Sequence, residues 1–165
     1  TTGLVYWLVF RIMWTMTETK LQVQESQERY QALFNGSEDP LFVYSIDENG
    51  QPESFTEVND RACSKLRYPR NTLLAKGLHE LTTAAELPHH HAHFSELVER
   101  GRALLETVLI RSDGKHVPFE INAHRLELNG RLTIVATARD LTRRKANESA
   151  LQDSEQRYRL LAEKR

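Results

Sequence analysis

A cluster of histidines near the middle of the chain holds the side chains best suited to site chemistry. Residues 87–93 read LPHHHAH, and within this run His89 and His93 stand four positions apart. On a helix, side chains at that spacing share a face, so this pair can ligate a metal ion. No cysteine and no carboxylate at a fixed spacing completes a ligand set. A solvated helix start is therefore the favoured interpretation, and a metal site is the alternative.

The rest of the chain offers little catalytic chemistry. Cys63 is the single cysteine, which excludes an internal disulfide and suits a reducing compartment. We expect it to be a small core residue on a helix. No phosphate-binding glycine loop, nucleophile elbow, zinc-hydrolase spacing or kinase signature is present in the sequence, which has only 7 glycines. The chain is therefore not expected to be an enzyme, and any catalytic output domain would lie outside it.

Composition indicates one globular domain with flanking segments. The chain has 165 residues, of which 39% are hydrophobic and 27% charged. The formal net charge is −1, so no basic excess is available to neutralise phosphates. Nucleic acid is therefore not an expected partner.

The first seventeen residues differ from the remainder. Residues 4–16 are apolar and aromatic apart from Arg11 and Thr15. A bilayer span needs about 20 apolar residues, so this run is too short to cross alone. We interpret residues 1–17 as the end of a transmembrane helix, with Trp7, Trp14 and Arg11 at the headgroup level. An amphipathic helix that packs on a partner is the alternative.

Helix signals bracket the body of the chain. Residues 18–34 form a helical connector, with good helix formers over Lys20–Phe34 and a stop at Asn35-Gly36. Asn59 is placed to N-cap a short helix, and Pro88 to open a longer one that reaches Arg100.

Three turn signals predict an antiparallel sheet. Each is an Asx-Gly pair between β-rich runs, and such pairs favour type I′ turns, which need positive φ at both central residues. The pairs are Asn49-Gly50, Asp113-Gly114 and Asn129-Gly130. The strands they predict are Leu41–Ile46, Ser54–Val58, Leu104–Ile110, Val117–Ala123 and Leu132–Ala138. The apolar phase changes at Leu126 and Leu128, which predicts a bulge or a turn of the strand there.

The last segment, residues 143–165, is predicted to be helical and repeats the first connector. Residues 24–30 read QESQERY and residues 152–158 read QDSEQRY, 128 positions apart. A repeat of that length is about one small domain, so a second module is expected to begin here. Leu151, Tyr158 and Leu161 follow heptad-like steps, which is typical of a short helical seam.

Four motifs in this order resemble the PAS sensor family, S-box type. Residues 28–34 (ERYQALF) are similar to its opening helix, and residues 57–63 (EVNDRAC) to its strand-to-helix step. Residues 109–115 (LIRSDGK) are similar to its "RKDG" hairpin, and residues 140–142 (DLT) to its closing "DIT" tripeptide. The resemblance runs from about Ser26 to Lys145. Each motif alone is weak evidence, but the four motifs together are specific.

The resemblance implies an α+β fold. We expect a PAS domain at residues 35–142, with a five-stranded antiparallel sheet, short helices on one face, and helices at both ends. The sequence departs from the pattern at Arg67, where the family usually has glycine. Such domains are usually homodimers, and they bind a small ligand or cofactor between sheet and helices, or none. The cofactor is therefore unknown.

The resemblance also implies a function in bacterial signal transduction. Such domains pass a signal through the C-terminal helix to an output domain, often a histidine kinase of a two-component system or a diguanylate cyclase. With the apolar start, this places the domain on the cytoplasmic side of the bacterial inner membrane, ahead of a tandem PAS module or output domain in the same chain. A relay that binds nothing is favoured over a ligand sensor.

Signal coupling is expected where the last strand meets the last helix. Asp140 can cap that helix, with Thr142 beside it, and Leu151, Tyr158 and Leu161 can transmit a shift through a dimer seam. The alternative function is a haem- or cofactor-binding sensor. Oxygen-sensing members use one histidine on the long helix, and His91 is similar in placement.

Overall fold

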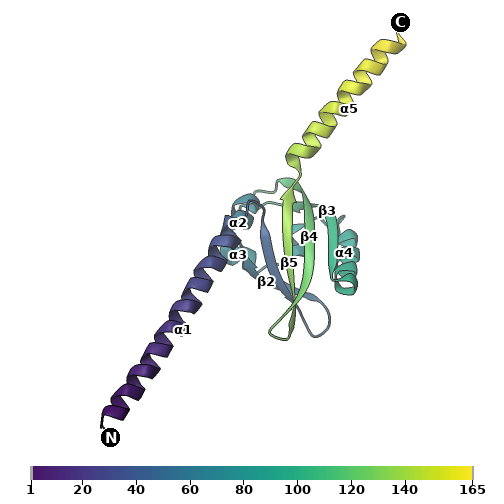
Figure 1. Cartoon of the computed structure of the whole chain (residues 1–165). Helices are drawn as coiled ribbons and strands as arrows, with labels where there is room; N and C mark the ends of the chain where they lie inside the picture. Colours follow the sequence, from purple (N-terminus) through teal and green to yellow (C-terminus); the bar gives the residue numbers. More distant parts are fainter. Residues whose placement is uncertain (1, 165) are drawn as a thin grey trace. The chain divides into compact units, whose positions relative to one another are not determined.

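The computed structural model describes the backbone of residues 2–164 and the side chains of residues 7–164. The chain divides into two units, residues 1–37 and 38–165. The first unit is one helix, α1 (Thr2–Gly36), and the second is an α+β domain that continues into a C-terminal helix, α5 (Thr142–Glu163) (Figure 1).

Helix α1 joins the two segments expected at residues 1–17 and 18–34 into one continuous element, and it ends at Gly36 as predicted. Trp7, Trp14 and Leu33 are exposed along it. Among the helices that the structure describes, none combines the length and apolarity that a bilayer crossing needs. A membrane role for residues 1–17 stays a prediction.

The domain is built on a five-stranded antiparallel sheet in the order β2-β1-β5-β4-β3, which confirms the predicted fold class (Figure 1). All neighbouring strands pair antiparallel, and β5 lies at the centre. The strands are β1 (Leu41–Ile46), β2 (Pro52–Val58), β3 (Arg102–Ile110), β4 (His116–Leu128) and β5 (Arg131–Asp140). Each is at the predicted place, and all but β1 are longer than predicted.

The three predicted turns are present, but only one has the predicted type. Asn129 and Gly130 both have positive φ, at 52° and 74°, as a type I′ turn requires. In the other two hairpins only Gly50 and Gly114 have positive φ. Their amides donate to Asp47 and Arg111, three residues back, so each loop is a turn closed by a left-handed glycine.

The bulge or turn predicted at Leu126 and Leu128 is absent from β4. The strand pairs with β5 without a register shift from Phe119 to Leu128. Successive side chains alternate between faces, so Leu126 and Leu128 belong to the face opposite Phe119 and Ile121, where both are exposed. The register shifts of the sheet lie between β1 and β2 instead.

Four short helices follow β2 and cover one face of the sheet. They are α2 (Asp60–Leu66), α3 (Arg70–Leu74), the 3-10 helix η1 (Leu78–Leu81) and α4 (Leu87–Arg100), which packs along β3 (Figure 1). Of these four, α2 and α4 were predicted. The core between helices and sheet includes Phe42, Leu66, Leu97, Phe119, Ile121 and Ile134.

Asn59 fixes the start of α2 and confirms the predicted cap. Its side chain is fully buried, and Oδ1 accepts hydrogen bonds from the amides of Ala62 and Leu41, both at 2.9 Å. Nδ2 donates to the carbonyl of Asp39 at 3.0 Å. One amide side chain therefore joins the first turn of α2 to the first residue of β1.

Arg67 shows why the family pattern has glycine at this position. It ends α2 with φ 57° and ψ 33°, in the left-handed region. A side chain with a Cβ is strained there, and glycine is not. An exposed ion pair offsets part of this backbone strain, because the guanidinium of Arg67 lies 3.4 Å from the Asp113 carboxylate.

We expect Arg67→Gly to raise the free energy of unfolding by about 1 kcal/mol, because it relieves this strain at the cost of a weak ion pair. Arg67→Ala is the matched control, since it loses the same ion pair but keeps a Cβ. Urea unfolding of the three proteins measures the difference. An Arg67→Gly variant no more stable than Arg67→Ala would contradict the strain argument.

Candidate functional site

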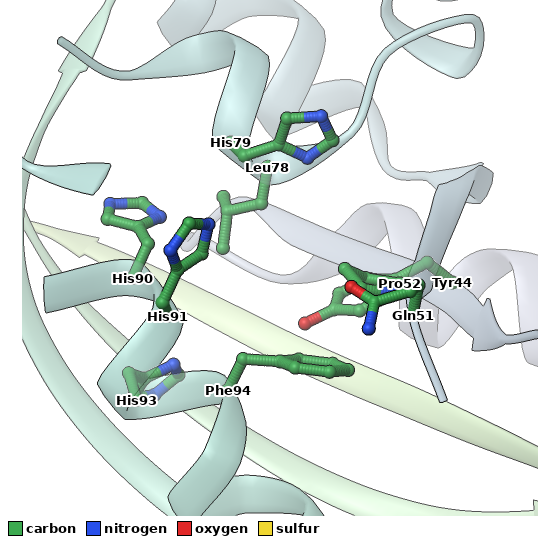
Figure 2. Close-up of a pocket in the computed structure, with 9 residues that line it drawn as sticks. All are labelled: Tyr44, Gln51, Pro52, Leu78, His79, His90, His91, His93 and Phe94. Atoms are coloured by element: carbon green, nitrogen blue, oxygen red, sulfur yellow. The ribbon is translucent and has the colours of Figure 1, made fainter. Parts of the chain in front are cut away.

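A pocket of about 320 Å³ opens between the helical layer and the β1–β2 hairpin. Figure 2 shows imidazoles from η1 and α4 on one side of it and side chains from the hairpin on the other. We call this the histidine pocket. Its lining residues are Tyr44, Gln51, Pro52, Leu78, His79, His90, His91, His93 and Phe94.

The structure separates the histidines that the sequence grouped as possible metal ligands. His89 is exposed and lies outside the pocket, with Nδ1 3.9 Å from a carboxylate oxygen of Glu86. His93 is buried beneath α4. Across the described part of the chain, no three histidine, cysteine, aspartate or glutamate side chains form a group that can hold a metal ion.

His90 belongs to a buried hydrogen-bond chain. Its Nε2 lies 2.8 Å from Oγ1 of Thr107 on β3, and that hydroxyl donates to Glu86 Oε2 at 3.0 Å. Because the hydroxyl proton is committed to Glu86, the ring donates from Nε2. Burial, followed by the neighbouring His93, lowers the pKa of His90 to about 4, so the ring is neutral at pH 7.

His93 is also buried, at 6% exposure, but its hydrogen bonding is incomplete. Burial lowers its pKa, while a hydrogen bond to the backbone of Ala103 on β3 acts in the opposite direction. Its Nε2 is buried and has no hydrogen-bond partner among the described residues. A buried polar atom without a partner carries a free-energy cost of about 1–3 kcal/mol, which a ligand can remove.

The opposite wall of the pocket comes from the sheet. Tyr44 is 3% exposed, packs against Phe55, and burial raises the pKa of its phenol. The phenol is therefore neutral and keeps its proton. Leu78 and Phe94 add apolar surface beside it. The pocket thus combines an apolar interior with a few neutral polar groups, the usual composition of a small-molecule site.

His91, the candidate ligand in the alternative haem-binding function, lines this pocket on the exposed side of α4 (Figure 2). The pocket volume lies at the low end of the roughly 300–1,000 Å³ typical of small-molecule sites. A porphyrin macrocycle needs more room than that. The residues present therefore fit a small molecule better than haem.

The second site is the end of β5, where two of the predicted signal-coupling residues, Asp140 and Thr142, meet. Oδ1 of Asp140 accepts hydrogen bonds from the amide of Thr142 at 2.8 Å and from its hydroxyl at 2.6 Å. The residue at the N-cap position is Leu141, so Asp140 lies one residue earlier than predicted. It still satisfies an amide that the first turn of α5 leaves unpaired.

Lys65 completes this site from α2. Its Nζ lies 3.0 Å from Oδ2 of Asp140, so one carboxylate joins α2, β5 and α5. Burial alone would raise the pKa of Asp140, but hydrogen bonds from Thr142 and Lys65 outweigh it and hold that pKa below its usual range. We call Lys65, Asp140 and Thr142 the exit junction.

Two further contacts fix the start of α5 on the sheet. The side chain of Leu141 is buried, and its amide donates to the carbonyl of Pro118 on β4 at 2.9 Å. Lys145, one turn into the helix, lies 3.4 Å from Glu106 on β3. Strands β3, β4 and β5 therefore all touch the first turn of α5.

The remaining predicted coupling residues lie along α5. Leu151, Tyr158 and Leu161 are all more than 60% exposed, and α5 has no buried residue among those described. The structure does not test their proposed role in a dimer seam. Sequence reasoning missed Lys65, Lys145 and the packing of Leu141, because only the fold brings α2, β3 and β4 to the end of β5.

Comparison with known proteins decides the family. A family model described as "PAS domain" matches residues 38–143. The chain belongs to the PAS domain family. The five-stranded antiparallel sheet agrees with this assignment. It is a sensor domain, and its matched region takes in both the histidine pocket and the exit junction.

Solved structures and a curated relative support the assignment. The PAS domain of an HTR-like protein from Haloarcula marismortui is 25% identical with a TM-score of 0.64, over 75% of this chain and 98% of that one. A PAS domain from a two-component sensor histidine kinase is 19% identical with a TM-score of 0.61, over 72% and 98%.

The curated relative is the "methyl sulfide methyltransferase-associated sensor" of Methanosarcina acetivorans, 23% identical over 128 residues. The match covers 78% of this chain but only 12% of that protein. The relative is therefore a much longer sensor that contains a similar domain.

We expect acid to destabilise the PAS domain through the buried histidines. The pKa of His90 falls from an ordinary value of 6.5 to about 4 on folding, so between these values the unfolded chain binds a proton that the folded domain does not. The contribution of His90 to the free energy of unfolding is fully present above pH 6.5. It decreases as the pH falls toward 4, by about 2 kcal/mol in total.

Chemical denaturation at pH 7 and pH 4.5 measures this loss. His90→Phe should reduce the difference between the two pH values, because no ring remains to be protonated. His89→Gln is the control, since that side chain is exposed. Equal pH dependence in wild type and His90→Phe would assign the acid sensitivity to other groups.

Proposed function

We propose that this PAS domain senses a small molecule in the histidine pocket and passes the signal across the exit junction into α5, toward a downstream output domain. The observation that carries the proposal is the carboxylate of Asp140, which is shared between Lys65 of α2 and Thr142 of α5. Its position couples the helical layer of the domain to the start of the C-terminal helix.

Strand pairing supplies a route between the two sites. Tyr44 lines the pocket and pairs with Ile134 on β5, the strand that ends at Asp140. A ligand that displaces β1 therefore also displaces β5, the strand that leads into α5. Packed sheets respond to such displacements as units, because their interiors are close-packed.

The pocket supports ligand sensing over the pure relay that the sequence favoured. The unpaired Nε2 of His93 carries a free-energy cost, which a relay that binds nothing keeps and which a bound hydrogen-bond donor removes. One solved neighbour with 16% identity is a PAS domain in complex with ethanol, which is a precedent for a small neutral ligand in this fold.

We further propose that α5 acts in a homodimer through Leu151, Tyr158 and Leu161 and leads into a second PAS module or an output domain. The repeat of residues 24–30 at 152–158 supports the second module. The similar kinase-derived PAS domain supports a histidine kinase as output, with a diguanylate cyclase as the alternative. Residues 1–17 and the family resemblance support a place on the cytoplasmic side of a bacterial membrane.

Helix phase tests this route. In a fusion of the whole chain to a histidine-kinase core, one residue inserted after Arg144 turns the following helix by about 100°. We expect kinase output to change at least several-fold, because the seam residues no longer face the same direction. A seven-residue insertion is the matched control, since a whole heptad restores the phase. Output that is indifferent to both insertions would contradict transmission through α5.

A further inference from the structure

We propose that the histidine pocket recognises a small uncharged molecule that donates a hydrogen bond, from a hydroxyl or amide group, to Nε2 of His93. The inference rests on the ligand-sensing function proposed above and names the chemical class of the ligand. Three properties of the pocket lead to it: the hydrogen-bonding state of His93, the absence of fixed charge in the lining, and the available volume.

The hydrogen-bonding state of His93 makes Nε2 an acceptor. The hydrogen bond to the Ala103 backbone favours the protonated ring, so the ring is its donor. Since Nε2 has no partner among the described residues, that donor is Nδ1–H. A neutral imidazole that donates from Nδ1 carries its lone pair on Nε2. The missing partner is therefore a donor.

The pocket lining has no fixed charge. Its nine residues include no aspartate, glutamate, lysine or arginine. The two buried imidazoles, His90 and His93, are neutral at pH 7. An ion held here would lose its hydration without gaining a counter-ion, which is costly in an apolar site. An uncharged ligand avoids this cost.

The volume limits the ligand to a small molecule. About 320 Å³ is the space of roughly ten water molecules at about 30 Å³ each, so a ligand of about ten non-hydrogen atoms fills it. Leu78, Phe94 and the ring of Tyr44 provide apolar surface for its body. One donor group on a compact apolar body is thus the predicted shape.

A matched set of six-membered-ring probes tests the inference on the whole chain. Cyclohexanol donates and accepts, cyclohexanone of nearly equal size only accepts, and cyclohexylammonium carries a charge. Backbone amide shifts of the pocket residues in NMR titrations give the three dissociation constants. We expect cyclohexanol to bind roughly tenfold more tightly than cyclohexanone, because only the alcohol can donate to Nε2. Cyclohexylammonium should bind more weakly than cyclohexanol.

His93→Phe should remove the preference for the alcohol and bring the two dissociation constants close together, because the acceptor is gone. His89→Ala, outside the pocket, should keep the preference. A second measurement needs no variant: the ¹⁵N resonance of Nε2 in wild-type His93 should report an unprotonated nitrogen at pH 7 and should move when cyclohexanol is added.

Equal or tighter binding of the ketone, or an Nε2 that carries a proton in the free domain, overturns the inference. Either result leaves the proposed route through the exit junction intact, since that route is tested by the helix insertions. Conversely, a clear alcohol preference together with output that ignores those insertions keeps the ligand class and overturns the route. If none of the three probes binds, the ligand class is overturned.

Discussion

The buried side chain of Asn59 is the interaction on which both functional regions of this domain depend. It is fully buried and bonds to the backbone at three places: residue 39, the first residue of β1, and the first turn of α2. A buried amide with its hydrogen bonds satisfied fixes geometry, because every alternative arrangement leaves polar atoms unpaired. Asn59 thereby sets the relation of α2 to the sheet.

The two elements that Asn59 joins, α2 and β1, each contribute a residue to one of the two sites. Helix α2 carries Lys65 to Asp140 and so to the start of α5, while β1 carries Tyr44 into the histidine pocket. β5 lies beside β1 and ends at Asp140, so both sites share one strand. In physical terms, the domain is a small sheet with a pocket near one end and a helix held at the other end by a few polar contacts.

Local chemistry explains what the sequence could predict. Asx-Gly turns, the Asn59 cap and Pro88 at the start of α4 each depend on neighbours within a few residues, and all three features are in the structure. The turn types, the supposed bulge in β4 and the ion pair of Lys65 with Asp140 depend on packing. Lys65 and Asp140 lie 75 residues apart, so no spacing rule can pair them. The histidines also show that burial depends on packing. The way α4 packs on β3 buries His90 and His93 and leaves His89 and His91 exposed.

The central claim is that the exit junction couples the body of the domain to α5. Lys65 is the informative residue, because it lies on α2 and its ion pair is with Asp140. Hydrogen exchange of the backbone amides of residues 142–148, compared between wild type and Lys65→Met, measures the coupling most directly. The account predicts exchange about fivefold faster in the variant, since a partly buried ion pair of about 1 kcal/mol no longer holds the carboxylate against Thr142. Unchanged protection of these amides, with the domain still folded, would contradict it.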